Sequence, residues 1–166
     1  MTRLKPLLSI CMITYNHQSY IREAIESIFL QKTNFNFELV ISNDNSTDDT
    51  HQQILNATKE IPPQITLVYH PQKKNLGIMQ NFVFTLKQCK GKYISLLDGD
   101  DYWTDPLKLQ KQVDFLEAND SYNICFHRVN IELNGEIFSD ENDDTNKIFH
   151  HIKKEKINYK HFIKHG

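Results

Sequence analysis

The sequence predicts an α/β protein in which a mostly parallel, Rossmann-like sheet is flanked by helices. Short apolar runs alternate along the chain with segments whose apolar residues recur at helical spacing, in the order βαβαβαβαβ. The runs have almost no polar face, which is typical of strands buried on both sides in a parallel sheet. Three of the runs end in polar residues, and ligands bind at the carboxyl ends of strands in such sheets.

The first half of the chain is expected to form two strand–helix pairs. Strands are predicted over residues 7–14 and 37–42, where the chain is almost continuously apolar. Apolar residues at helical spacing predict a helix over residues 19–31. A second helix is expected over residues 47–59, because residues 46–49, Ser-Thr-Asp-Asp, fit a capping box.

Two more strand–helix pairs follow. A third strand is predicted at residues 65–69, followed by a helix over residues 78–89. The next strand, residues 93–97, reads Tyr-Ile-Ser-Leu-Leu and is expected to be buried on both sides. A helix should then start at Asp105 and Pro106, because aspartate favours the capping position and proline the first helical position.

The last part of the chain is expected to form a small hairpin and a tail. A fifth strand is predicted within residues 122–133. Asn134-Gly135 is a strong hairpin turn signal, so residues 136–138 should pair back in the antiparallel direction. Residues 140–146 are polar and are expected to form a mobile loop. Residues 157–163 suggest a terminal helix, or an apolar segment that packs against something else.

Composition narrows the function classes. The 166 residues suffice for one domain with a real core, and the net charge of −2 with no long basic block excludes nucleic acid as an expected partner. No apolar run reaches the length of a membrane span, and the start lacks a secretory leader pattern. Cys11, Cys89 and Cys125 lack zinc-site spacing, so we expect buried free thiols in a reducing compartment, which indicates a cytoplasmic protein.

An acidic cluster follows the strand at residues 93–97. It consists of Asp98, Asp100 and Asp101, with Gly99 allowing a sharp turn between the carboxylates. Two carboxylates about 4 Å apart repel by about 4 kcal/mol at an effective dielectric near 20, so a cation or hydrogen-bond donors should offset the charge. Oxygen ligands suit Mg²⁺ or Mn²⁺. The alternative is a solvated acidic turn, because short acidic loops are common.

Two further strand ends carry polar residues that should meet this cluster. Thr14, Tyr15 and Asn16 follow the first strand, and residues 43–46, with Asp44 among them, follow the second. The carboxyl ends of parallel strands converge on one edge of a sheet. There the Tyr15 ring could stack on a base, and Asp44 could accept a hydrogen bond from a base or a ribose. The alternative for each is turn chemistry, because asparagine, aspartate and serine are turn and cap residues.

Known phosphate-binding glycine motifs are absent. The sequence has no GxGxxG and no GxxxxGK[ST], which excludes a dinucleotide-binding Rossmann unit and a P-loop NTPase. A phosphate would have to be met by a cation or by Lys73 and Lys74. These two lysines are more simply explained as solubility residues of a loop.

Four stretches resemble the family 2 glycosyltransferases of the GT-A fold, and they occur in that family's order across most of residues 7–118. They read SICMITYNHQSYIREAIESIFLQ, FELVISNDNSTDDT, KNLGIMQNF and GKYISLLDGDDYWTDPLKLQKQVDFLE. The resemblance implies a nucleotide-sugar site, usually for a UDP-sugar, formed by Thr14, Tyr15, Asn16, Asp44, Asn75, Asp98 and Asp100. It also implies a Mn²⁺ or Mg²⁺ ion bridging the diphosphate. The motif can be placed in two registers, Asp98-Gly99-Asp100 or Asp100-Asp101. Judged by distance to Pro106, Asp101 is favoured as the metal ligand, with Asp100 nearer the ribose or sugar or also on the metal.

The resemblance also implies transfer of a hexose, with inversion, to a glycan or lipid-linked glycan in cell-surface polysaccharide synthesis. Family members are usually longer, and their second half supplies the acceptor site and the general base. We therefore expect residues 1–166 to be a single, truncated GT-A-like domain: a nucleotide-sugar-binding part at 7–118 and a hairpin and tail at 121–166. The general base is expected to be absent from this chain. Peripheral association with the inner face of the cell membrane, through the missing region, and a homo-oligomer stay open.

Two other functions stay open on the residues alone. A nucleotidyltransferase shares the sheet order and the acidic strand ends, but the basic glycine-rich loop expected after the first strand is replaced by TYNHQS. A non-catalytic module that holds a nucleotide sugar would need the same strand ends and no general base.

Overall fold

The computed structural model describes residues 5–127, 129–133 and 136–138. The chain divides into two compact units, Met1–Asn123 and Ile124–Gly166. The first unit contains the parallel sheet and its helices. In the second, the described elements are two short strands.

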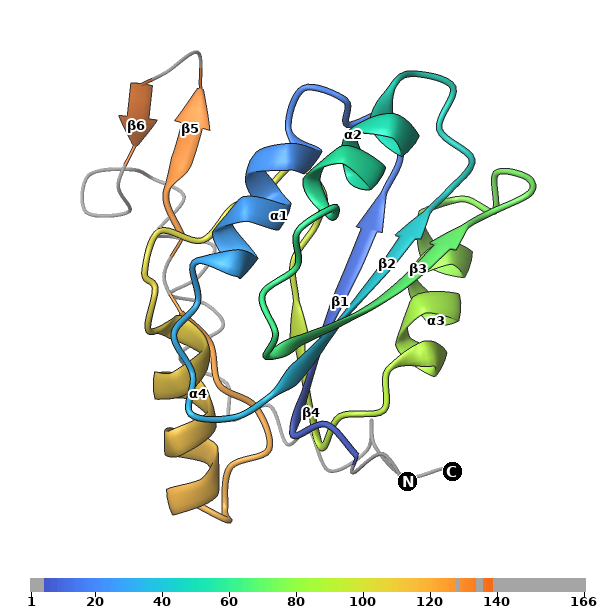
Figure 1. Ribbon diagram of the computed structural model, residues 1–166. Coiled ribbons are helices and arrows are strands. Elements are labelled where there is room, and N and C mark those ends of the chain that lie inside the picture. The colour runs from blue at the N-terminus through green and yellow to red at the C-terminus, as the bar shows by residue number, and fades with distance from the viewer. Residues whose placement is uncertain (1–4, 128, 134–135, 139–166) are drawn as a thin grey trace. The chain divides into compact units, whose positions relative to one another are not determined.

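A four-stranded parallel sheet forms the centre of the first unit (Figure 1). Its strands are β1 (Leu8–Thr14), β2 (Phe37–Asn43), β3 (Ile65–Pro71) and β4 (Tyr93–Leu96), in the spatial order β3-β2-β1-β4. The chain moves outward from β1 to β3 and then returns to the other side of β1 for β4. The strand order therefore reverses between β1 and β4, and such switch points are where open α/β sheets bind ligands.

Four helices complete the unit: α1 (Ile21–Phe29), α2 (Thr50–Ala57), α3 (Ile78–Gln88) and α4 (Lys108–Ala118). The alternation of side chains along a strand assigns α1 and α3 to opposite faces of the sheet. On β2, Ile41 belongs to the apolar cluster that includes α1, whereas the hydroxyl of its neighbour Ser42 donates to Asn81 Oδ1 of α3 at 2.6 Å. The doubly wound arrangement predicted from the sequence is confirmed.

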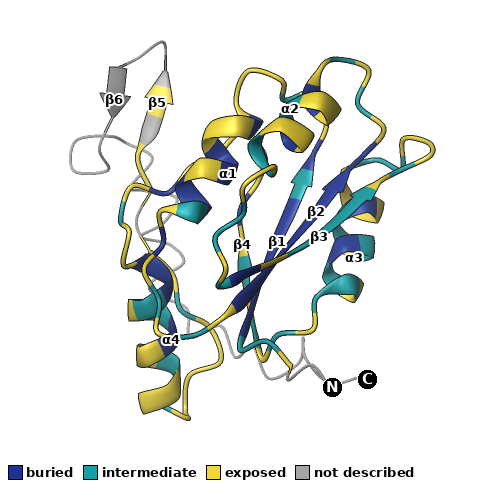
Figure 2. Cartoon of the chain, viewed as in Figure 1, coloured by how far each residue is buried: buried dark blue, intermediate teal, exposed yellow. Residues whose placement is uncertain are grey.

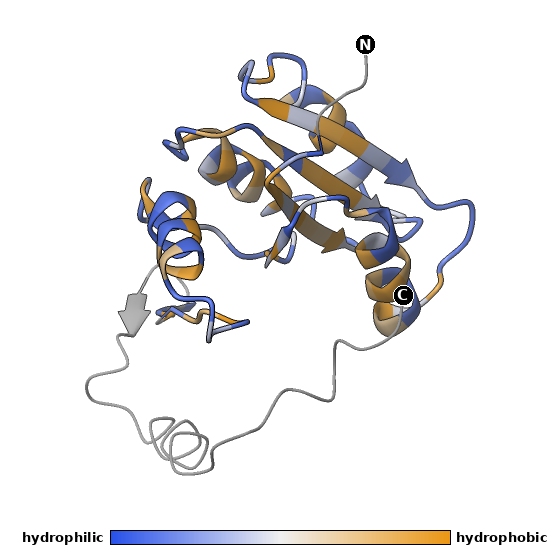
Figure 3. Ribbon diagram, turned by 90° about the horizontal axis from the view of Figure 1, so that it is seen from below, coloured by the Kyte–Doolittle hydropathy of each residue, from blue (hydrophilic) through white to orange (hydrophobic). Residues whose placement is uncertain are grey.

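The core lies mainly between the sheet and α1, and β1 and β2 are buried along almost their whole length (Figure 2). Figure 3 shows the same strands as largely hydrophobic, with both hydrophobic and hydrophilic residues on the helices. The fully buried apolar side chains are Ile10, Met12, Ile21, Ala24, Ile25, Ile28, Leu39, Val40, Ile41, Ile54 and Leu109. Apolar residues at helical spacing in α1 thus produce its buried face, as predicted.

A buried carboxylate fixes the loop that leads into β4. Glu38 is only 4% exposed, and its Oε1 accepts from the Ser9 hydroxyl at 2.5 Å and from the Lys90 amide at 2.6 Å. The Gly91 amide donates to the Ser9 hydroxyl oxygen at 2.7 Å. A Cβ on Gly91 would lie 2.5 Å from the Ser9 backbone nitrogen, so only glycine fits this close approach. These contacts set where β4, and hence the acidic cluster beyond it, starts.

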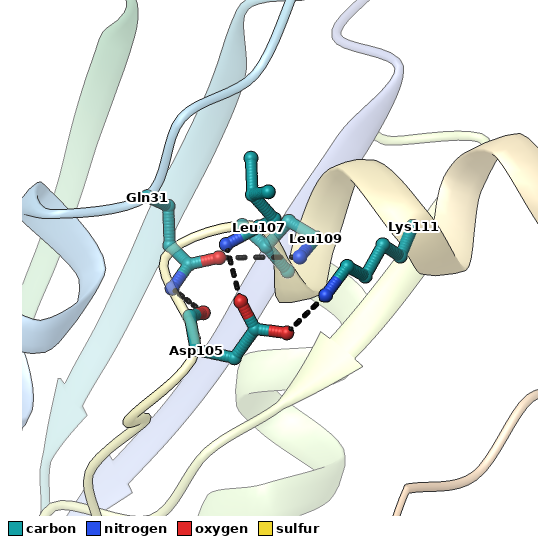
Figure 4. A network of polar contacts seen from close by, with 5 residues as sticks. All are labelled: Gln31, Asp105, Leu107, Leu109 and Lys111. Carbon is teal, nitrogen blue, oxygen red and sulfur yellow. Dashed lines mark hydrogen bonds and ion pairs between the residues drawn. The ribbon is translucent and has the colours of Figure 1, made fainter.

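The start of α4 is tied to the end of α1 (Figure 4). The buried Gln31 side chain donates from Nε2 to the Asp105 carbonyl at 2.9 Å and accepts at Oε1 from the Leu109 amide at 3.1 Å. The Asp105 carboxylate accepts from the Leu107 amide and pairs with Lys111, each at 2.8 Å. The predicted helix start at Asp105 and Pro106 is therefore wrong: α4 begins at Lys108 with Leu107 as its N-cap, and Asp105 instead bonds the turn that precedes the helix.

Two strand predictions are wrong. The strand predicted at residues 93–97 is not buried on both sides: Ile94 and Leu96 are 45% and 55% exposed, because β4 ends the described sheet and α3 packs over β1 and β2. The fifth strand predicted within residues 122–133 shrinks to β5 (Ile131–Leu133), which does not join the parallel sheet. The alternation of the chain therefore ends with four parallel strands.

The predicted hairpin partner is confirmed: β5 pairs in the antiparallel direction with β6 (Glu136–Phe138). Asn134 and Gly135, the predicted turn, lie outside the described residues. So do the loop predicted at residues 140–146 and the segment predicted at residues 157–163.

The predicted capping box at residues 46–49 is wrong. The helix α2 begins at Thr50, and its amide donates to the Asp48 carboxylate at 3.0 Å. The Ser46 hydroxyl instead donates to Asn43 at 2.6 Å, within the loop that follows β2. Local side-chain bonding in the loop competes with the helix for these residues and delays its start.

The three cysteines are free, as predicted, but only Cys11 is fully buried, and Cys89 and Cys125 are partly exposed. A hydrogen bond to Cys89, together with burial, raises the pKa of the Cys11 thiol far above its usual range. Among the described residues, no helix is both long enough and apolar enough to cross a membrane.

Candidate functional site

The loops that follow β1, β2 and β4 meet at one edge of the sheet. The Asp44 amide donates to the Thr14 carbonyl at 2.9 Å, and the Gly99 amide donates to the Ile13 carbonyl at 3.0 Å. The end of β1 is therefore bonded to the chain beyond β2 on one side and beyond β4 on the other. This confirms the geometric part of the prediction, since the polar strand ends come together at the switch point of the sheet.

Gly99 packs against two polar side chains of the β1 loop. A Cβ at this glycine would lie 2.6 Å from Thr14 Oγ1 and 3.0 Å from His17 Nδ1. Both of these atoms are buried and have no hydrogen-bond partner among the described residues. Buried polar atoms are almost always bonded, so these two unpartnered atoms beside an acidic turn are candidates for contact with a further ligand.

The carboxylates of the acidic cluster crowd one another. Partial burial, followed by the charges of Asp100 and Asp101, raises the pKa of Asp98 above its ordinary value of 3.8. Partial burial and the charge of Asp100 likewise raise the pKa of Asp101. The imidazole of His17 opposes both shifts. The cluster thus carries excess negative charge, which an added cation would relieve.

The carboxylate oxygens of the acidic cluster suit a divalent cation that takes its remaining ligands from a bound substrate. In the part of the chain that the structure describes, no group of three or more histidine, cysteine or acidic side chains forms a complete metal site. Mg²⁺ and similar ions are commonly held by one or two carboxylates together with phosphate oxygens of the substrate. Asp100 and Asp101 could supply such a partial shell of oxygen ligands.

Asn16 holds two loops together. Its backbone is in the left-handed region, with φ of 56°, and its Oδ1 accepts from the Thr47 amide at 2.8 Å. The Asn16 amide donates to the Ser46 hydroxyl at 2.9 Å, and the Gln18 amide donates to the Asp48 carboxylate at 3.1 Å. We call these five residues the loop clasp. The Asn16 side chain, predicted as a ligand contact, is used by the structure to fix the loops beside the site.

Asp44 is also engaged by the protein. It is 3% exposed, and its Oδ1 and Oδ2 accept from the amides of Leu76 and Gly77 at 2.7 and 2.9 Å. The Asn75 side chain donates to the Asp44 carbonyl at 3.3 Å. Asp44 and Asn75, both predicted as ligand contacts, therefore join the loop after β3 to the loop after β2. Each carboxylate oxygen has a second lone pair, so Asp44 keeps some capacity to accept from a ligand.

Tyr15 and the two lysines behave as surface residues of this edge. The Tyr15 side chain is 42% exposed, which leaves its ring accessible for stacking. Lys73 and Lys74 are exposed on the loop between β3 and α3. Their exposure agrees with the simpler explanation of loop lysines.

One residue of the edge was missed at the sequence level. His17 Nε2 lies 3.8 Å from Asp100 Oδ2, and the ring packs against Gly99. The only available signal was its place in the polar break after the first strand, three residues beyond Thr14. Nothing in the linear sequence relates that position to Asp100, which lies on the other side of β1.

Comparisons with known proteins assign a family. The sequence model described as glycosyl transferase family 2 matches residues 9–166. The uncharacterized protein Rv1520 of Mycobacterium tuberculosis (strain ATCC 25618 / H37Rv) is 40% identical over 124 residues, which are 75% of this chain and 35% of that protein. The Escherichia coli UDP-Glc:alpha-D-GlcNAc-diphosphoundecaprenol beta-1,3-glucosyltransferase WfaP is 37% identical over 112 residues, 68% of this chain and 42% of that protein.

Solved structures agree on the fold. S. aureus TarS 1–349 in complex with UDP is 27% identical, with a TM-score of 0.59, over 67% of this chain and 32% of that chain. The mannosyltransferase PcManGT from Pyrobaculum calidifontis, in complex with GDP-Man and Mn²⁺, is 23% identical with a TM-score of 0.56, over 69% of this chain and 33% of that chain. The predicted GT-A fold is confirmed by these neighbours.

The chain spans only 35% of the length of its M. tuberculosis relative and 42% of WfaP. The family model nevertheless covers almost the whole chain from β1 onward, including all three loops of the site. The chain belongs to glycosyl transferase family 2.

Proposed function

We propose that this chain forms the donor-binding part of a glycosyltransferase that uses a UDP-sugar together with Mn²⁺ or Mg²⁺. The observation that carries the proposal is the edge between β1 and β4, where the crowded carboxylates flank Gly99, which packs against a buried Thr14 hydroxyl that has no partner among the described residues. TarS in complex with UDP and the UDP-Glc donor in the name of WfaP support the nucleotide. PcManGT in complex with Mn²⁺ supports the divalent cation.

Each part of the edge has a role in this proposal. Tyr15 stacks on the base, Asp44 accepts from the base or ribose, and Thr14 donates its hydroxyl to the nucleotide. Asp98 stands next to the ribose, while Asp100 and Asp101 hold the cation. A cation bound by these carboxylates would supply positive charge for the diphosphate leaving group.

In this proposal Asn16 and Asn75 do not contact the nucleotide sugar themselves, but hold the loops that form the site. Positioning groups of this kind matter because a reacting group displaced by about 1 Å can lose about 100-fold in rate. The loop clasp gives His17 a fixed neighbour on each side in sequence, Asn16 and Gln18, and gives Tyr15 one, Asn16.

The reaction that we propose is transfer of a hexosyl group, with inversion, to an acceptor hydroxyl of a glycan or lipid-linked glycan. The diphosphoundecaprenol acceptor in the name of WfaP supports a lipid-linked one. Such an acceptor places the enzyme at the cytoplasmic face of a membrane, in cell-surface polysaccharide synthesis. An inverting transfer needs a base within about 3 Å of the acceptor hydroxyl, and the described carboxylates beyond the cluster are not proposed for that role.

Calorimetric titration of the chain with UDP and ADP, with and without Mn²⁺, tests the proposal. We expect UDP to bind more tightly than ADP, and Mn²⁺ to strengthen UDP binding, because the cation links the diphosphate to the carboxylates. Equal affinity for both nucleotides, or UDP binding unaffected by Mn²⁺ and Mg²⁺, would contradict it. A nucleotide-sugar-binding module without chemistry would pass this test, and release of free UDP from the donor separates the two.

A further inference from the structure

We propose that His17 is a positioning residue that orients the Asp100 carboxylate toward the cation of the donor site. The inference rests on the proposed function and adds to it a residue beyond the three carboxylates. Three observations support it: the imidazole is fixed, the Asp100 side chain is not, and the two face each other.

The His17 side chain is positioned by its backbone and by Gly99. The His17 carbonyl accepts from the amides of Tyr20 and Ile21, at 3.0 and 2.9 Å, where α1 begins. Its neighbours Asn16 and Gln18 both belong to the loop clasp. The side chain is 24% exposed, and its Nδ1 would lie 3.0 Å from a Cβ at Gly99, so the ring packs against that glycine. The point from which the ring reaches Asp100 is therefore fixed.

The Asp100 side chain has little to hold it apart from this ring. It is 51% exposed, and within the described ranges His17 is its only recorded partner. At 3.8 Å the two groups are not yet hydrogen-bonded, since a hydrogen bond needs about 2.7–3.2 Å. A rotation of the free carboxylate toward the fixed ring closes this gap, and contacts of this kind commonly tighten only when the ligand binds.

The two ring nitrogens have different surroundings, and these select the tautomer. Nδ1 is buried with no partner, so a proton placed there would be a buried donor without an acceptor. Nε2 faces the Asp100 carboxylate, which accepts a proton donor well. The ring is therefore placed to donate from Nε2 to one oxygen of Asp100. The other oxygen of that carboxylate would then be left for a cation, as for ligands fixed by an outer hydrogen bond.

The test compares His17→Phe, which removes the donor, with His17→Gln, whose amide nitrogen can occupy the position of Nε2. His51→Phe is the control, because His51 is an exposed histidine of α2 that bonds Tyr69 and touches no carboxylate of the cluster. Mn²⁺ affinity is measured by electron paramagnetic resonance at saturating UDP, and UDP affinity without metal by calorimetry.

We expect His17→Phe to weaken Mn²⁺ binding about 10-fold or more, the range found when outer hydrogen bonds to metal ligands are lost. Metal-free UDP affinity should stay the same, and His17→Gln and His51→Phe should bind Mn²⁺ nearly as the native chain does. A merely structural role would instead lower metal-free UDP affinity and Mn²⁺ affinity together, and that result overturns the inference.

Unchanged Mn²⁺ affinity in His17→Phe also overturns the inference about His17. In that case the proposed function still stands if the native chain binds UDP in a Mn²⁺-dependent way. If the native chain shows no Mn²⁺-dependent UDP binding, both proposals fall. Long-range ¹H–¹⁵N spectra of the ligand-free protein give a separate check. The His17 resonance, assigned by its loss in His17→Gln, should show the proton on Nε2, and a proton on Nδ1 would contradict the inference.

Discussion

At the scale of single residues, the acidic cluster opposes the folded state until something neutralises it. Asp98 and Asp101 have pKa values raised above 3.8, mainly by partial burial and then by neighbouring carboxylates. A carboxyl group whose pKa is higher in the folded chain than in the unfolded chain stabilises the fold below the unfolded value. This contribution is lost as the pH rises through the folded pKa. The metal-free protein therefore gains less from these groups at neutral pH than in acid.

Asp101→Asn should consequently raise the melting temperature of the metal-free chain at pH 7. The gain should shrink as the pH falls toward 3.8, because protonation then removes the same charge from the native protein. In the presence of UDP, the variant should lose the stabilisation that Mn²⁺ gives the native chain. Thermal unfolding across pH, with and without Mn²⁺ and UDP, measures both effects. A gain in melting temperature that is independent of pH would contradict the charge argument. The control is Asp114→Asn, on the exposed face of α4 and outside the acidic cluster.

At the scale of secondary-structure elements, the approach to β4 depends on backbone contact. The Gly91 amide bonds Ser9, and a Cβ at this position would lie 2.5 Å from the Ser9 nitrogen and 2.7 Å from the Leu8 carbonyl carbon. Neither backbone atom can move without disturbing β1, which is the central strand of the described site. Next to this contact, the Lys90 amide donates to the buried Glu38 carboxylate at 2.6 Å and so also holds the chain that enters β4.

Gly91→Ala should therefore lower the free energy of unfolding by about 1–3 kcal/mol, the usual range for overpacking. Because the clash displaces β4 from β1, Mn²⁺-dependent UDP affinity should fall as well. Lys87→Ala, an exposed substitution near the end of α3, should change neither quantity by much. Denaturant unfolding and calorimetry measure the two effects, and a fully stable Gly91→Ala variant would show that the loop can shift freely.

At the scale of the whole molecule, the candidate site occupies one edge of the sheet, and several described carboxylates outside it are engaged by other side chains. Two of the described carboxylates beyond the cluster are paired: Asp105 with Lys111 at 2.8 Å, and Glu117 with Lys92 at 2.7 Å. Both pairings lower the pKa of the carboxyl group, through hydrogen bonds from the lysines, which makes it a weaker base. Asp114 accepts from Gln110 at 2.7 Å along the same helix.

We therefore expect the 166-residue chain to bind UDP with Mn²⁺ yet to transfer sugar to an acceptor poorly or not at all. Release of free UDP from a panel of UDP-sugars, with and without lipid-linked glycan acceptors, measures this directly. Efficient transfer, abolished by a substitution of a carboxylate within residues 102–166, would show that the chain carries its own general base.

Much of this architecture could be predicted from the sequence, because the buried positions of a helix or strand recur at a regular spacing along the chain. Continuous apolar runs identified all four parallel strands, and apolar residues at helical spacing identified α1 and α3. Polar residues directly after β1, β2 and β4 predicted which edge of the sheet carries the candidate site. Such signals are local, so each can be recognised without knowing what it packs against.

Other features depended on contacts between distant segments. Only the strand order places β4 beside β1, and that neighbourhood brings His17 next to Asp100 and Thr14 next to Gly99. Only the folded loops engage Asp44 with the amides of Leu76 and Gly77. The exposure of Ile94 on β4 likewise follows from which helix covers which strand. A residue pattern records how buried a position is, whereas the partner that buries it is set by the path of the whole chain in space.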